Sequence, residues 1–238
     1  MSDILINETF VEDGGLFDED FDSGNYESID SLNLRVQAQE LSNETEIEHL
    51  ISYDKIKKNL EFHFEYQKEG ALKILRDMNC SGLLSDEVGL GKTITAGIVL
   101  KECIERGLVK KALILTPPSL VDQWAAELKE KFELNFTIIE DEKSWNSADL
   151  VIASIDRVKI YDHKNSKFRH DKAHQVSWDL LVVDEAHKLK DRTTTRWRFV
   201  DKIQKKRFLV LTATPFQNDL LELYNLLHIL KKGHLGTI

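Results

Sequence analysis

Residues 82–93 read GLLSDEVGLGKT, and this stretch decides the fold class. Residues 82–84 suit a short buried strand, a glycine-containing turn follows, and the pattern after it has helical periodicity. A strand, such a turn and a Gly-Lys-Thr helix start form a cradle for phosphate, because backbone N–H groups close on the anion and the helix N-terminus adds partial positive charge. Lys92 is expected to bind the β- and γ-phosphates, and the Thr93 hydroxyl to bind Mg²⁺.

The stretch departs from the usual phosphate-binding loop at one position. Asp86 stands where the eight-residue pattern has its first glycine. For this stretch alone, a glycine-rich turn that only caps a helix therefore remains an alternative.

The rest of the chain from about residue 65 alternates short apolar runs with helical patterns. Strands alternating with helices predict an α/β domain, with a parallel sheet covered by helices on both faces and functional loops at the carboxyl ends of the strands. The expected strands lie at 82–84, 112–115, 137–139, 150–153, 180–183 and 208–211. The expected helices lie at 66–77, 93–105, 120–132, 193–204 and 219–230, the third opening with a capping-box-like Ser119-x-x-Asp122.

A second motif places two acids at the end of an apolar run. Residues 181–187 read LVVDEAH. We expect Asp184 to hold Mg²⁺, directly or through water, and Glu185 to polarise an attacking water. The alternative is that these acids form an exposed helix start. A Gly-Lys-Thr sequence about 90 residues earlier, in a chain that alternates strands with helices, favours the metal site.

Charge is distributed unevenly along the 238 residues. The net charge is −9, but residues 1–60 carry −11 and residues 61–238 carry +2. Residues 1–31 are rich in acid, glycine and serine and are expected to be a disordered tail. Residues 32–60 are an accessory segment whose structure the sequence leaves open, and residues 61–238 are expected to form the α/β lobe.

Cysteine content and hydropathy indicate the compartment. Cys80 and Cys103 are the two cysteines, and they lie in no metal-binding pattern, which favours small buried thiols in a reducing compartment. Neither a secretory signal nor a run long enough to span a membrane is visible, so a soluble intracellular protein is expected.

Taken in order, the motifs resemble those of superfamily two helicases, in particular the Swi/Snf-type DNA translocases. DEVGLGKT at 86–93 has the acid that this group shows in motif I, and DEAH at 184–187 is its motif II. The other matching stretches are EYQ at 65–67, LTPPSLVDQWAAEL at 115–128, IASID at 152–156, and LTATPFQN at 211–218 followed by LELYNLLHIL at 221–230.

The resemblance implies a RecA-like first lobe that uses ATP and Mg²⁺. It implies nucleotide binding by Gln67, Asp86, Glu87, Gly89, Leu90, Gly91, Lys92 and Thr93, catalysis by Lys92, Asp184 and Glu185, and metal binding by Thr93 and Asp184. It implies coupling roles for His187, Thr212, Thr214 and Gln217. Double-stranded DNA is the implied partner, contacted by Pro117, Ser119 and Ser154 without sequence preference. Basic residues at 157–172, 188–198 and 202–207 are candidates for further phosphate contacts, although such charge runs are often only solvated faces.

The resemblance also implies a second RecA-like lobe that reaches ATP with arginines across the cleft. Motifs of that lobe are not seen in the sequence, so we expect a truncated or split translocase, or a fragment, that is nearly inactive alone. A non-catalytic nucleotide- or DNA-binding remnant and a restriction-type helicase subunit are the alternatives. The expected location is the cytoplasm, in association with the nucleoid, for a prokaryotic protein, which is favoured, and the nucleus for a eukaryotic one.

Overall fold

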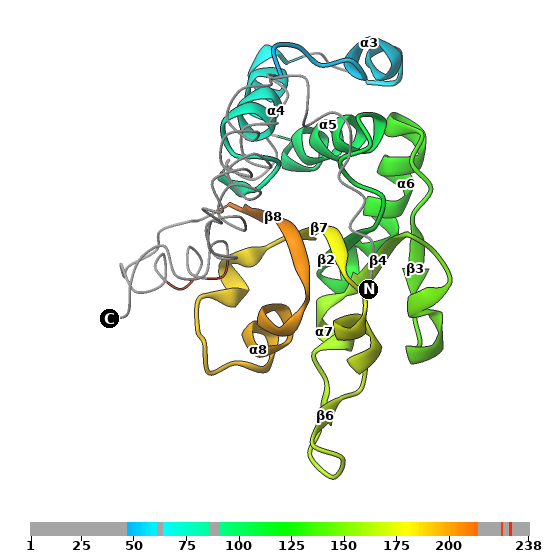
Figure 1. The fold of residues 1–238 in the computed structure, drawn as a ribbon, viewed down its shortest axis with the longest axis vertical. Coiled ribbons are helices and arrows are strands. Elements are labelled where there is room, and N and C mark those ends of the chain that lie inside the picture. The colour runs from blue at the N-terminus through cyan, green and yellow to red at the C-terminus, as the bar shows by residue number, and fades with distance from the viewer. Residues whose placement is uncertain (1–46, 61–63, 86–90, 214–224, 226–228, 230–238) are drawn as a thin grey trace, which may run out of the picture. The chain divides into compact units, whose positions relative to one another are not determined.

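The computed structural model describes residues 47–60, 64–85, 91–213, 225 and 229. A six-stranded parallel sheet flanked by helices forms the framework, which confirms the predicted fold class (Figure 1). Its strands are β1 (Gly82–Ser85), β2 (Ala112–Thr116), β3 (Thr137–Ile139), β4 (Leu150–Ser154), β7 (Trp178–Val183) and β8 (Lys205–Thr212). The α-helices are α3 (Tyr53–Ile56), α4 (Glu65–Asp77), α5 (Lys92–Glu105), α6 (Val121–Phe132), α7 (Ile155–Val158) and α8 (Thr195–Lys202).

The strand order is β1-β8-β7-β2-β4-β3, and every neighbouring pair is parallel. All six carboxyl ends therefore meet at one edge of the sheet. At that edge Ser85 of β1 pairs with Thr212 of β8, and Val183 of β7 pairs with Val210 of β8. This order places β8 between the strand that precedes Lys92 and the strand that precedes Asp184.

Alternate residues of the strands enter two separate cores, because successive side chains of a strand point to opposite faces. On β2, Ile114 belongs to the core under α4, α5 and α6, whereas Leu113 and Leu115 belong to the core shared with α7 and α8. The same alternation divides Leu180 and Leu181 of β7. Burial on both faces explains why these strands read as unbroken apolar runs.

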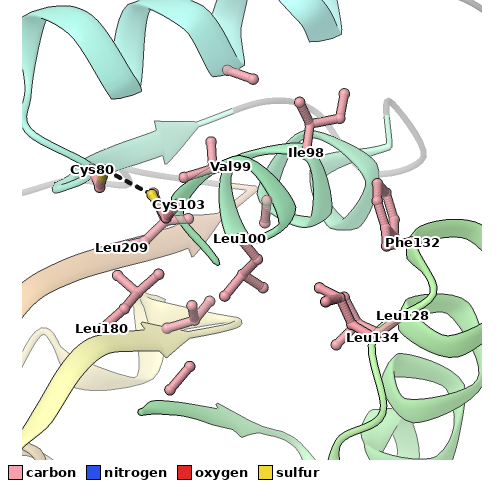
Figure 2. Packing of buried hydrophobic residues seen from close by; sticks show 14 of the residues in the cluster. Cys80, Ile98, Val99, Leu100, Cys103, Leu128, Phe132, Leu134, Leu180 and Leu209 are labelled. Carbon is pink, nitrogen blue, oxygen red and sulfur yellow. Dashed lines mark hydrogen bonds between the residues drawn. The ribbon is translucent and has the colours of Figure 1, made fainter. Parts of the chain in front are cut away.

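Helix α5 lies in the middle of the first core, and α6 approaches it closely (Figure 2). Gly97 permits this approach, since a Cβ there would lie 2.3 Å from Cε2 of Phe132. Near the other end of α5, the buried thiol of Cys103 lies 2.7 Å from the thiol of Cys80. Both cysteines are free, as the sequence predicted for buried thiols.

Residues 47–60 belong to the segment 32–60, for which the sequence predicted no definite structure. They pack into the first core. Ile47, Leu50, Ile56 and Leu60 are buried there with the side chains of α5 and α6. Ile56 ends the short helix α3, which the 3₁₀ helix η2 (Lys57–Asn59) follows directly, and the other three residues lie outside these helices. This part of the chain is therefore continuous with the core of the lobe.

Two local features differ from the sequence expectation. The prediction of a capping box at Ser119 is wrong. Ser119 lies inside the 3₁₀ helix η3 (Pro118–Leu120), and α6 begins at Val121 without a side-chain cap. The strands β5 (Tyr161–Asp162) and β6 (Lys167–Phe168) form an antiparallel hairpin within the basic stretch 157–172, which the sequence did not predict. Among the described residues, no helix is long and apolar enough to cross a membrane.

Candidate functional site

The two motifs that carry the predicted phosphate and metal chemistry meet at the carboxyl edge of the sheet. Lys92 and Thr93 form the first turn of α5, and Asp184 follows directly after β7. One strand, β8, separates β7 from β1, so the two motifs leave the sheet about 10 Å apart, or two strand spacings. Asp86, Glu87, Gly89 and Leu90 lie outside the described residues.

Gly91 starts α5 in the left-handed conformation, with φ +76°, which a glycine adopts without strain. Gln67, buried on α4, lies directly against it: a Cβ at Gly91 would be 2.3 Å from Gln67 Nε2. The structure thus brings Gln67 to the start of α5, although 24 positions separate the two residues in sequence.

Within the described part of the chain, three hydrogen bonds hold the carboxylate of Asp184. Trp124 Nε1 donates to Oδ2 at 2.9 Å, Thr116 Oγ1 donates to the same oxygen at 3.3 Å, and the backbone N–H of Glu185 donates to Oδ1 at 2.8 Å. Asp184 is 8% exposed and Trp124 is 1% exposed. Donors that hold a carboxylate in one orientation suit a metal ligand.

Glu185 has an unusual backbone conformation for its type, with φ 53° and ψ 46°. A non-glycine residue pays about 1 to 3 kcal/mol for such a conformation, which is found most often at functional sites. Its Oε2 lies 3.0 Å from Nδ1 of His187, and both side chains are partly exposed. The predicted coupling residue His187 is therefore in direct contact with the predicted catalytic residue Glu185.

The remaining predicted coupling residues belong to the end of β8 and the segment after it. Thr212 ends β8 and is buried at the same sheet edge. Thr214 and Gln217 lie outside the described residues.

The predicted DNA-contacting residues also follow strands at this edge. Ser119 is exposed just beyond β2, whereas Pro117 is buried. Ser154 ends β4 and is 7% exposed, and its hydroxyl has no hydrogen-bond partner within the described part of the chain. Ser119 is thus the one of the three that presents itself at the surface.

Arg196, one of the arginines after the DEAH sequence, is bound within the lobe. Its Nε donates to Asp156 Oδ1 at 2.9 Å, and Lys159 Nζ lies 2.7 Å from the same oxygen. Burial alone would raise the pKa of Asp156, but the hydrogen bonds from Lys159 and Arg196 outweigh it and lower this pKa. This pairing holds Arg196 within the lobe, on Asp156 of α7.

Thr116 and Trp124 are site residues that sequence reasoning missed. Both lie inside the stretch LTPPSLVDQWAAEL, where only Pro117 and Ser119 were singled out. The available signal was chemical: a tryptophan on the buried face of α6 needs an acceptor for its indole N–H. A buried carboxylate at the end of a neighbouring strand is such an acceptor.

The chain matches proteins of one family. The SNF2-related domain matches residues 41–238. The protein of Bacillus subtilis (strain 168) named uncharacterized ATP-dependent helicase YqhH is 47% identical over 174 residues, which are 72% of this chain and 30% of that protein. The RNA polymerase-associated protein RapA of Actinobacillus pleuropneumoniae serotype 7 (strain AP76) is 37% identical over 157 residues, 57% of this chain and 16% of RapA.

Solved structures agree with the fold. The Sulfolobus solfataricus SWI2/SNF2 ATPase core in complex with dsDNA matches with a TM-score of 0.65 and 24% identity, over 75% of this chain and 38% of that one. The SWI2/SNF2 ATPase core domain of the same organism matches with a TM-score of 0.62 and 25% identity, over 75% and 37%. The chain spans less than two fifths of each of these four proteins. With the family matched over residues 41–238 and its RecA-like sheet in place, the chain belongs to the SNF2-related family.

Proposed function

We propose that this chain is the ATP-binding first lobe of a DNA translocase, which couples ATP hydrolysis to movement along double-stranded DNA when a second RecA-like lobe pairs with it. One observation carries the proposal. The N-terminus of α5, with Lys92 and Thr93, and the buried carboxylate of Asp184 stand at the same carboxyl edge of one parallel sheet. This edge is where α/β sheets bind nucleotides.

The residues present fit Mg²⁺ and the phosphates of ATP. Mg²⁺ prefers hard oxygen ligands, and the Thr93 hydroxyl and the Asp184 carboxylate are of that type. We assign the positive charge for the phosphates to Lys92. Contact with the base is assigned to Gln67, which lies beside Gly91. Bound Mg²⁺ would neutralise charge that develops on the transferred phosphoryl group.

Glu185 is the group we assign to orienting the attacking water. Its backbone conformation turns it away from the path of β7, next to Asp184, and the contact with His187 restrains its carboxylate. We assign to His187 the coupling role, in which changes outside the nucleotide site reach Glu185 through this contact.

DNA is proposed to lie along the loops after β2 and β4. Exposed Ser119 offers a hydroxyl donor for phosphate oxygens, whereas the hydroxyl of Ser154 is buried. The hairpin after α7 adds exposed cations, Lys164, Lys167 and Arg169. Hydrogen bonds and charge on phosphates fix position on a duplex without reading its sequence. A second lobe is proposed as the source of arginines, because Arg196 is already bound to Asp156.

Duplex binding at Ser119 tests the DNA part of the proposal. We expect the chain to bind a fluorescent duplex of any sequence, with an affinity that falls as salt rises. Ser119→Glu should weaken this binding by about tenfold, because a carboxylate placed beside a phosphate repels it. Ser147→Glu is the matched control, since Ser147 is exposed just before β4, at the amino end of that strand and away from the carboxyl edge of the sheet. Equal affinities of the two variants would contradict the assignment.

A further inference from the structure

We propose that Trp124 is a positioning residue for the Mg²⁺ ligand Asp184, so that helix α6 sets the metal affinity of the nucleotide site. This inference rests on the proposed function, because it assigns Asp184 to Mg²⁺. It concerns one atom, the indole Nε1, which donates to Asp184 Oδ2 at 2.9 Å across 60 positions of sequence.

The hydrogen bonds to Asp184 leave a defined part of the carboxylate for a cation. Each carboxylate oxygen can accept two hydrogen bonds. Among the described residues, Oδ2 accepts from both Trp124 and Thr116, whereas Oδ1 accepts from the backbone of Glu185. The remaining acceptor position, open to a cation, is therefore on Oδ1. The two donors on Oδ2 fix the rotation of the carboxylate, and this rotation sets the direction of that position.

The donor itself is held rigidly. Trp124 is 1% exposed in the core that also contains Val121 and Leu128 of α6, and Phe132 at the end of this helix packs against Gly97 of α5. Helix α6 thus touches the helix that carries Lys92 and Thr93, and its Trp124 donates to the carboxylate of Asp184 just after β7. The same helix starts one residue after η3, which holds Ser119.

A purely structural role predicts something different. If Trp124 only filled the core, its ring would contribute to stability and its N–H would have no effect on Mg²⁺ affinity. Removing a hydrogen-bond partner of a metal-ligating side chain typically changes metal affinity by about 10- to 100-fold. Trp124→Phe keeps most of the ring and removes the donor, so it separates the two roles.

The experiment measures ATP binding by calorimetry as a function of Mg²⁺ concentration. For Trp124→Phe we expect the half-saturating Mg²⁺ concentration to rise about tenfold, while ATP affinity in EDTA stays unchanged. Trp145→Phe is the matched control: Trp145 is equally buried, at 1%, and its Nε1 donates at 3.1 Å to His170 Nδ1 in the other core. We expect this variant to lose stability without any change in the Mg²⁺ dependence.

Each outcome bears on a different claim. If the unsubstituted chain binds ATP without any Mg²⁺ dependence, the proposed function itself is contradicted. If that dependence is present and is the same in Trp124→Phe, the positioning role is overturned while the proposed function stands. Should Trp124→Phe fail to fold, Thr116→Val removes the other donor to Oδ2 without changing side-chain shape. An unchanged Mg²⁺ dependence in Thr116→Val would then overturn the inference.

Discussion

The carboxylate of Glu102, on the helix that begins with Lys92, accepts a hydrogen bond at 2.9 Å from the backbone N–H of Ser52, fifty residues earlier. It also accepts from the Ser52 hydroxyl, the backbone N–H of Ile51 and Arg106 Nε, and Glu102 is fully buried. Burial alone would raise the pKa of Glu102, but these hydrogen bonds outweigh it and lower this pKa. A charged buried carboxylate therefore fastens residues 47–60 to α5.

Glu102→Ala is expected to reduce the free energy of unfolding by about 3 kcal/mol, because it leaves buried donors and Arg106 without their acceptor. Urea denaturation at pH 7 measures this. Glu105→Ala is the control on the same helix, since Glu105 pairs with exposed Lys55 and should cost under about 1 kcal/mol. Equal losses in the two variants would show that Glu102 does not anchor the segment.

Asp179 is expected to make stability depend on acid pH. Burial opposes ionisation of Asp179, but the backbone N–H groups of Lys111 and Lys110, together with Lys206, outweigh it and lower its pKa to about 2. A lowered folded-state pKa contributes stability above the unfolded value of about 4, and this contribution is lost as pH falls from about 4 to 2. Asp179→Asn should cost about 1 to 2 kcal/mol at pH 7 and flatten the curve in that range. Urea midpoints from pH 2 to 7 test this, and a parallel curve for the variant would refute it.

Glu185→Gln is expected to keep nucleotide binding and abolish turnover in a protein that carries both lobes. The amide has nearly the shape of the carboxylate but cannot accept the proton of the attacking water. Asp184→Asn should instead weaken the Mg²⁺ dependence of binding. Phosphate release and calorimetry distinguish the two effects. Turnover of Glu185→Gln at the unsubstituted rate would contradict the water-positioning role.

Removal of residues 1–31 is expected to strengthen duplex binding, most clearly at low salt. The charge of −11 over residues 1–60 repels phosphate or competes with it for the basic residues. Anisotropy titrations of both chains over a salt series test this. No gain in affinity at any salt concentration would contradict it.

Much of the fold could be predicted because strand and helix patterns here agree with tertiary burial. β2 and β7 are buried on both faces, so their sequences are continuous apolar runs, and α4 and α6 each bury one side. The order of the motifs then predicted that Lys92 and Asp184 meet at one sheet edge.

The features that escaped prediction depend on partners far away in sequence. Residues 47–60 are too short and mixed in composition to show a periodic pattern, and Glu102 supplies the acceptor that orders Ser52. The hairpin at 161–168 is set by Phe168, which packs between Tyr161 and Phe199. Similarly, the donor from Trp124 to Asp184 follows from how α6 packs on the sheet, which no local pattern reveals.

Binding of Mg-ATP to the chain and to Lys92→Ala tests the central claim most directly. A ligand at 100 times its Kd adds about 2.7 kcal/mol to the free energy of unfolding, so a thermal-shift titration reads binding as a rise in Tm. Lys101→Ala is the control on the same helix, because Lys101 pairs with Glu105 near the other end of α5. We predict that Mg-ATP raises the Tm of the unsubstituted chain and of Lys101→Ala and leaves that of Lys92→Ala nearly unchanged. An equal rise in Lys92→Ala would contradict the assignment of this sheet edge as the nucleotide site.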